Sequence, residues 1–269
     1  MSEQDDALAQ LRATRALDGL RWAHRTAYRQ VMDDYDPETG HTQVWVGMSA
    51  YVILQDRMDR VFSCGRYAVD PEDPDAGRDL LLAGILQREF DTMPPIPPGT
   101  VVRADLNGSP GWQCGSWRWL LTSARFGHID NIPWPQKRST KQRVAQQPSP
   151  EDLTLFSLSE AGSGRAGEAL DELVALAQES TKILILAHSV DRHTGVTELF
   201  LGRPRFNEGG GYAWHWRVNL RSLPPGGSGT GRVPGPPQPP GSGSDPVADA
   251  PVRLRPTSTE GTDQASGQR

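Results

Sequence analysis

The first residues that suggest chemistry lie close together in the last folded part of the sequence. They are three histidines, His188, His193 and His215, and two acids, Asp191 and Glu198. His188 and His215 fall in predicted strands, and Glu198 falls in the run between them. If the turn-forming cluster 191–195 (DRHTG) closes a hairpin, His188 lies opposite or next to Glu198. A carboxylate can orient an imidazole for acid–base catalysis or help it to bind a metal. Since HxH and HExxH spacings are absent, we expect no metal site.

The segment 212–220 (YAWHWRVNL) alternates between apolar and polar residues with the period of a strand. Its polar face carries His215, Arg217 and Asn219, which together offer an imidazole, a guanidinium and a carboxamide. Such a row can hold a phosphate or a carboxylate by hydrogen bonds, or it is only the wet face of a sheet. The face expected to be core carries Tyr212, Trp214, Trp216, Val218 and Leu220.

A second group of candidates is a short basic segment that follows a tryptophan. Its members are Trp134, Lys137, Arg138, Lys141 and Arg143, with no acidic residue among them. Cations neutralise backbone phosphates and an exposed aromatic ring stacks on a base, so this composition suits nucleic acid or another polyanion. The alternative is a solvated loop that balances the charge of an acidic protein. Four cations alone predict weak, salt-sensitive binding.

Two other patterns are weaker indications of chemistry. The stretch 162–167 (GSGRAG) matches GxGxxG and opens a predicted helix, as in a dinucleotide site. The run before it is interrupted by hydroxyl residues, and the segments after it indicate an antiparallel meander, so we expect no cofactor. Cys64 and Cys114 lack CxxC spacing, which argues against a structural zinc site, and neither is expected to be a nucleophile.

Composition restricts the class of protein. The chain has 269 residues and a formal net charge of −5, which argues against a general nucleic-acid binder but allows a local basic patch. No apolar run is long enough to span a membrane, and the acidic start of the chain differs from a signal peptide. We therefore expect a soluble, cytoplasmic protein without a membrane partner. The excess of Arg over Lys indicates a bacterial source.

Hydrophobic periodicity predicts helices over 4–32, 42–63 and 76–92, although the start of the second (VWVG) also fits a strand. The first is expected to place Arg21, Arg25 and Arg29 mostly between its apolar positions. The proline-rich run 93–99 cannot be helical and is either a connector between lobes or a strap across the sheet. The expected core faces of the second and third helices comprise Val44, Met48, Tyr51, Gln55, Met58 and Phe62, and Leu80, Leu81, Ile85, Leu86 and Phe90.

The remainder indicates strands, with one further helix over 166–180. The predicted strands are 100–106, 117–123, 183–190, 196–201 and 212–220, and Asn107-Gly108 is a tight-turn signal. The segment 117–123 also fits a short helix. The fold class is therefore α+β, with N-terminal helices packed on a mainly antiparallel sheet.

We expect three regions along the chain. Residues 1–93 form a helical lobe, residues 94–221 form a sheet lobe packed with it as one compact domain, and residues 222–269 form a disordered tail. The tail holds ten Pro and nine Gly but no aromatic residue, so it cannot bury enough apolar surface to offset the entropy of ordering.

Three functional hypotheses follow. The favoured one is a bacterial binding or adaptor protein that holds a polyanion or a protein partner on the face of His215, Arg217 and Asn219 or on the segment 134–143. The second is an enzyme acting on phosphate esters or nucleic acid, with His188 or His215 as general acid or base and Arg217 as the anion clamp. The third is a structural protein tethered through its proline-rich tail. Nothing in the sequence indicates an oligomeric state.

Overall fold

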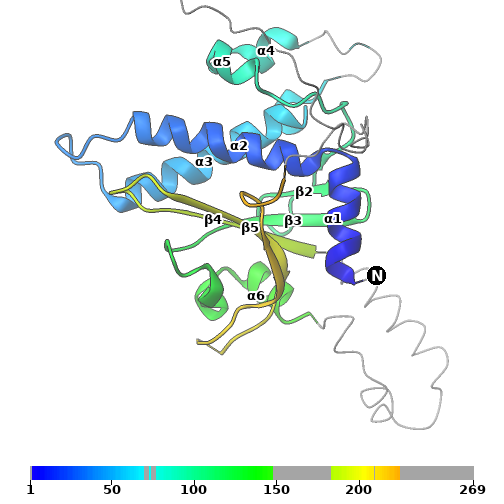
Figure 1. Ribbon diagram of the computed structural model, residues 1–269, viewed down its shortest axis with the longest axis vertical. Coiled ribbons are helices and arrows are strands. Elements are labelled where there is room, and N and C mark those ends of the chain that lie inside the picture. The colour runs from blue at the N-terminus through cyan, green and yellow to red at the C-terminus, as the bar shows by residue number, and fades with distance from the viewer. Residues whose placement is uncertain (1, 70–72, 74–76, 148–182, 209, 225–269) are drawn as a thin grey trace, which may run out of the picture. The chain divides into compact units, whose positions relative to one another are not determined.

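The computed structural model of the protein describes residues 2–69, 73, 77–147, 183–208 and 210–224. The α+β class is confirmed. In the described residues the strands form one six-stranded sheet in the order β1-β2-β3-β4-β5-β6, in which β3 and β4 are parallel and the other pairs are antiparallel (Figure 1).

The helices are α1 (Glu3–Ala13), α2 (Ala16–Asp33), α3 (Gln43–Val61), η1 (Gly65–Tyr67), α4 (Arg78–Leu82), α5 (Gln87–Phe90), η2 (Ile129–Asn131), η3 (Trp134–Gln136) and α6 (Ser139–Ala145). The strands are β1 (Val102–Arg103), β2 (Gly111–Cys114), β3 (Trp117–Ser123), β4 (Ile183–Val190), β5 (Thr197–Pro204) and β6 (Trp214–Asn219).

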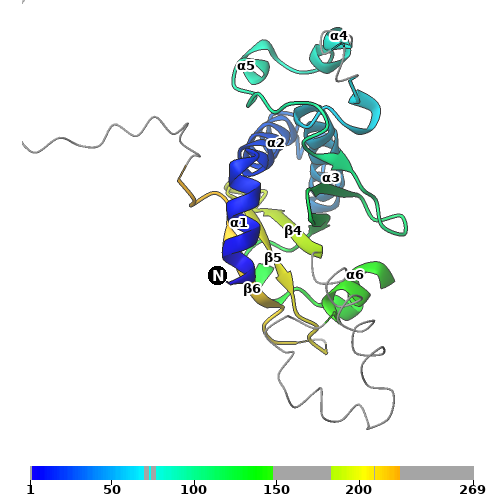
Figure 2. The same cartoon turned by 90° about the vertical axis from the view of Figure 1, so that its right-hand side faces the viewer.

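Both faces of the sheet are covered. Because side chains alternate along a strand, neighbouring residues of β3, β4 and β5 enter two separate cores. Figures 1 and 2 show α1, α2 and α3 on one side of the sheet and α6 on the other. The helix face carries Trp119, Leu121, Leu184, Leu186, Leu199 and Leu201. The opposite face, here called the loop face, carries Leu120, Ile185, Ala187 and Phe200 and packs against Ile129, Trp134 and Val144.

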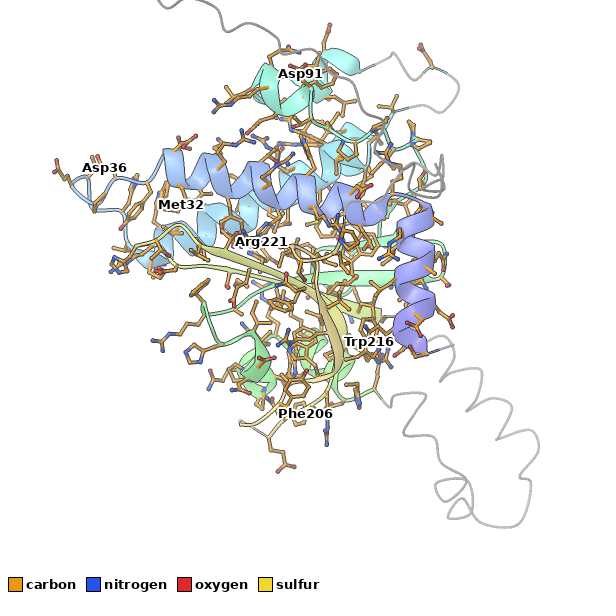
Figure 3. All side chains as sticks on the ribbon, viewed as in Figure 1. Met32, Asp36, Asp91, Phe206, Trp216 and Arg221 are labelled. Atoms are coloured by element: carbon orange, nitrogen blue, oxygen red, sulfur yellow. The ribbon has the colours of Figure 1, made fainter. Side chains whose placement is uncertain are left out.

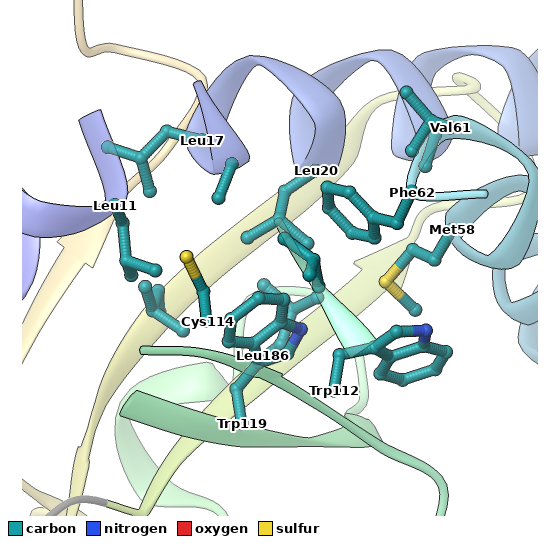
Figure 4. Close-up of a cluster of buried hydrophobic side chains, with 14 of the residues drawn as sticks. Leu11, Leu17, Leu20, Met58, Val61, Phe62, Trp112, Cys114, Trp119 and Leu186 are labelled. Atoms are coloured by element: carbon teal, nitrogen blue, oxygen red, sulfur yellow. The ribbon is translucent and has the colours of Figure 1, made fainter. Parts of the chain in front are cut away.

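The prediction of one helix over 4–32 is wrong, because the chain turns between α1 and α2. Arg15 adopts the left-handed conformation with φ of 60°, which ends the regular helix hydrogen bonding. The turn lets Leu11 of α1 and Leu17 of α2 approach Cys114 of the sheet from two sides (Figure 4). Burial of both helices against the sheet therefore outweighs the continuity of the apolar pattern.

The second predicted helix is confirmed as α3, with Thr42 as its N-cap, so the strand alternative for VWVG is wrong. Its core face is only partly as predicted. Met58 and Phe62 are buried, but Val44 is 69% exposed and Met48 is 67% exposed. Val46 and Ala50 are buried instead, because α3 is apolar nearly all round at its start and packing against α2 selects the face.

The third predicted helix, over 76–92, is wrong. Two short helices, α4 and α5, stand in its place, and Gly84 between them has φ of 78°. Leu80 and Leu86 are exposed rather than core. The segment is held by polar contacts: Glu89 is buried with its carboxylate 3.5 Å from the Arg57 guanidinium.

The proline-rich run 93–99 packs against α2 and does not cross the sheet. Ile96 is buried in the core formed by the helices, next to Phe62 and Gly19. Gly19 makes this approach possible, since a Cβ there would lie 2.5 Å from the Phe62 ring. The run is therefore part of the helix core and is neither a strap nor a free connector.

The predicted strands and turns are present, with one unpredicted strand and one error of alternation. The hairpin turn at 191–195 is confirmed, and Asn107 and Gly108 have φ of 45° and 73°, as a tight hairpin turn requires. Strand β2 was not predicted. At the end of β5 the pairing shifts register, so Trp214 packs on the loop face while Trp216 contacts the helix-face core.

The described residues belong to one compact unit, in which the helices and the sheet share a core. The predicted helix 166–180, the GxGxxG stretch 162–167 and all but the first residues of the predicted tail lie outside the described residues. No helix in the described ranges is long and apolar enough to cross a membrane.

Candidate anion-binding site

His188 is a buried residue of the core. It lies on β4 and is 1% exposed, and its Nδ1 is 2.6 Å from the hydroxyl oxygen of Tyr28 on α2. Nε2 has no hydrogen-bond partner in the described part of the chain. Burial lowers the pKa of His188 to about 3, so the ring is neutral at pH 7 and closed to solvent. It cannot serve as an accessible acid or base.

Glu198 does not orient His188. The backbone register pairs His188 with Leu199 and Glu198 with Ser189, so His188 and Glu198 point to opposite faces of the sheet. The Glu198 carboxylate accepts hydrogen bonds from the Ser189 hydroxyl and from the Gly127 backbone N–H, the latter at 3.0 Å. The expected imidazole–carboxylate pair is therefore absent.

Arg217 lies on the loop face, away from His188. Its Nε donates to the Asp130 carboxylate at 2.5 Å, and its guanidinium carbon lies 4.3 Å from the centre of the Phe200 ring. His188 is on the helix face, so His188, His215 and Arg217 do not converge on one pocket, and the predicted acid–base site is not formed. The side chain of Asn219 accepts a hydrogen bond from the Arg221 backbone and so supports the turn after β6.

Trp134 is also unavailable to a ligand. The ring is fully buried, lies edge-on to Trp214 with centroids 5.7 Å apart, and donates from Nε1 to the Ala213 carbonyl at 2.9 Å. The prediction that it stacks on a base is wrong. The sequence could not show this, because the contact depends on how η3 packs beneath β6.

Three of the four predicted cations do converge. A pocket of 530 Å³ lies between α3 and the segment that joins η3 to α6, and we call it the lysine pocket. Lys137, Arg138 and Lys141 line it, whereas Arg143 is exposed elsewhere on α6. The pocket is lined by Val44, Gly47, Met48, Tyr51, Gln55, Gly108, Pro110, Thr122, Ser123, Gln136, Lys137, Arg138 and Lys141.

The charges of the lysine pocket are not balanced by acids. Among the described residues, Lys137, Arg138 and Lys141 form no ion pair. Burial lowers the pKa of Lys141 to about 8, and the positive charges of Lys137 and Arg138 add to this shift. Burial also lowers the pKa of Lys137, whose Nζ donates to the Ser123 carbonyl at 2.7 Å. An anion in the pocket would relieve this repulsion.

Tyr51 supplies the aromatic surface that Trp134 cannot. The ammonium of Lys141 lies 6.0 Å from the centre of its ring, and the ring stacks with that of His188, with centroids 6.2 Å apart. Tyr51 belongs to the predicted core face of the second helix, but it is half-buried and lines the pocket. The exposed side chains of Val44 and Met48 form an apolar rim beside it.

The pocket can therefore hold an anion together with an apolar or aromatic group. Cationic donors, the hydroxyls of Thr122 and Ser123 and an aromatic ring meet in one open cavity. Within the described ranges, no group of three or more His, Cys, Asp or Glu residues is placed to hold a metal ion.

Comparison of the chain with protein-family models, with curated proteins and with solved structures gives no match.

Proposed function

We propose that this protein is a binding protein that holds a polyanion of the nucleic-acid class in the lysine pocket and catalyses no reaction there. The observation that supports the proposal is the convergence of Lys137, Arg138 and Lys141 without a carboxylate partner in the described part of the chain. Unpaired, partly buried cations are unfavourable unless an anion neutralises them. These three cations were among the residues that the sequence suggested, whereas Tyr51, Val44 and Met48 were not.

A single strand fits the pocket better than a duplex. Tyr51 and the rim of Val44 and Met48 offer flat apolar surface to an unstacked base, while the cations meet the adjacent phosphates. The net charge of −5 on the whole chain opposes binding elsewhere, so binding is expected to be local to the pocket.

The number of cations sets the expected salt dependence. Three phosphate contacts to a single strand predict that log K falls with log salt with a slope of about −2. Affinity is therefore expected to fall about 16-fold between 50 and 200 mM salt, which follows from that slope. A slope near zero would show that the contacts are not made to phosphates.

The test is fluorescence anisotropy of a labelled single-stranded oligonucleotide titrated with the full chain at several salt concentrations. Lys137→Ala and Arg138→Ala are each expected to weaken binding and to make the salt slope shallower by about 0.7. Arg143→Ala is the matched control, because Arg143 is a cation of the same helix region that lies outside the pocket. The absence of affinity at low salt, or equal losses in all three variants, contradicts the proposal.

A protein partner with an acidic surface is the alternative occupant of the same pocket. Competition with polyglutamate separates the two occupants, because polyglutamate has charge but no bases. We expect it to displace the oligonucleotide poorly, since it makes no stacking contact with Tyr51. Equal displacement by both polymers favours the acidic protein.

A further inference from the structure

A second basic groove lies along α2, whereas the lysine pocket lies along α3. It has a volume of 470 Å³ and lies between α2 and the chain around the start of β5 and the end of β6. We call it the arginine groove, and none of its lining residues is shared with the lysine pocket. Its lining includes His24, Asp33 and four arginines, Arg21, Arg25, Arg29 and Arg221.

The arginines reach the groove from two walls. Arg21, Arg25 and Arg29 recur every fourth residue of α2, so they lie on one side of the helix at a spacing of about 6 Å along its axis. Arg221, labelled in Figure 3, comes from the turn after β6. Its guanidinium donates to the Thr197 carbonyl. Two sides of the groove therefore present guanidinium groups to the same space.

Two of these four guanidiniums have no acidic partner. Arg29 lies 3.9 Å from Glu89 and Arg21 lies 3.6 Å from Asp18. Neither of the other two, Arg25 and Arg221, forms an ion pair with any residue that the structure describes. Asp33 is the one acid among the lining residues, so the groove keeps an excess of positive charge.

The inner wall of the groove adds an unsatisfied polar atom. His24 is 3% exposed, and its ring is hydrogen-bonded to the Glu198 backbone. Nε2 of His24 has no partner within the described residues, although a buried polar atom left unpaired costs about 1–3 kcal/mol. Because the neutral ring donates to the Glu198 backbone, Nε2 is an acceptor, so the donors that the groove offers to a ligand oxygen are the guanidiniums.

We propose that the arginine groove binds the phosphate group of a small phosphorylated ligand, with Arg25 and Arg221 as the clamp. A phosphate carries close to two negative charges at pH 7, and the planar fork of arginine donates two parallel hydrogen bonds to such an oxyanion. The volume of 470 Å³ falls in the range of small-molecule sites. Asp33 at the groove disfavours a long polyanion, which separates this site from the lysine pocket.

The test is a titration of the full chain with inorganic phosphate at constant ionic strength, followed by NMR of the His24 and Tyr28 ring signals. We expect these signals to shift, and we expect Arg25→Ala and Arg221→Ala each to raise Kd at least about tenfold, as for loss of a charge-assisted hydrogen bond. Arg12→Ala removes an exposed cation of α1 outside the groove and is expected to leave Kd unchanged. Arg221→Lys keeps the charge without the fork and is expected to give an intermediate Kd.

This proposal is overturned if phosphate leaves the His24 signals unchanged. It is also overturned if phosphate binding is lost in Lys137→Ala rather than in Arg25→Ala. Because Arg25 is exposed and forms no ion pair with a described residue, its substitution is not expected to affect folding. The site is also tested separately from the proposed function. If the oligonucleotide fails to bind while phosphate binds in the groove, only the polyanion proposal is wrong.

Discussion

The two buried histidines make a quantitative prediction about stability in mild acid. His24 and His188 are 3% and 1% exposed, and burial is the main cause that lowers the pKa of each to about 3 from the ordinary value of 6.5. In the unfolded chain both rings take up a proton near pH 6.5, whereas in the native protein they remain neutral. The unfolded state therefore binds more protons, and stability is expected to be lost as the pH falls from 6.5 toward 3.

The size of this loss follows from the two pKa values. Between pH 7.5 and pH 5.0, proton uptake by one unfolded imidazole lowers the free energy of unfolding by about 2 kcal/mol, and two imidazoles lower it by about 4 kcal/mol. The result depends little on the native pKa, because at pH 5.0 a group with a pKa of about 3 is still neutral. A loss of this size is a large part of the stability of an ordinary domain.

The assay is urea denaturation at both pH values. His188→Gln retains a side chain that can hydrogen-bond Tyr28, and we expect it to reduce the difference in unfolding free energy between the two pH values by about half. His24→Gln is expected to do the same. The same change at His128, which is exposed, controls for the loss of an imidazole as such. The reasoning is refuted if His188→Gln and His24→Gln both keep the full pH difference of the parent chain.

Two further predictions concern the lysine pocket and the helix core. Since the pKa of Lys141 is about 8, oligonucleotide affinity is expected to be constant below pH 8 and to fall above it as the amine loses its charge. Fluorescence anisotropy at fixed salt should show this fall in the parent protein but not in Lys141→Met. Gly19→Ala places a Cβ 2.5 Å from the Phe62 ring and is expected to destabilise the protein by about 1–2 kcal/mol in urea denaturation. Gly47→Ala, with nothing within 4 Å of the added Cβ, is the helical control and is expected to stabilise the protein by up to about 1 kcal/mol. Equal effects of the two alanines would show that the contact between α2 and Phe62 is not tight.

The local signals in the sequence were sufficient for the fold class and for most strands. The tight turn at Asn107-Gly108, the hairpin at 191–195 and the start of α3 at Thr42 depend on the conformational preferences of a few adjacent residues. The alternation along β3 and the continuous apolar run at the start of β4 likewise lie within single segments. Such features can be read from the sequence because the physical cause lies within a short segment.

Tertiary packing decided what the candidate residues can do. Arg15 ends α1 although the apolar pattern continues, Trp214 changes face at the β5–β6 register shift, and Trp134 is enclosed beneath Trp214. Tyr51 and the arginines of α2 line open pockets that periodicity alone did not indicate. Whether a side chain is buried, paired or exposed depends on residues far away in the sequence, and the sequence carries no direct measure of those distances.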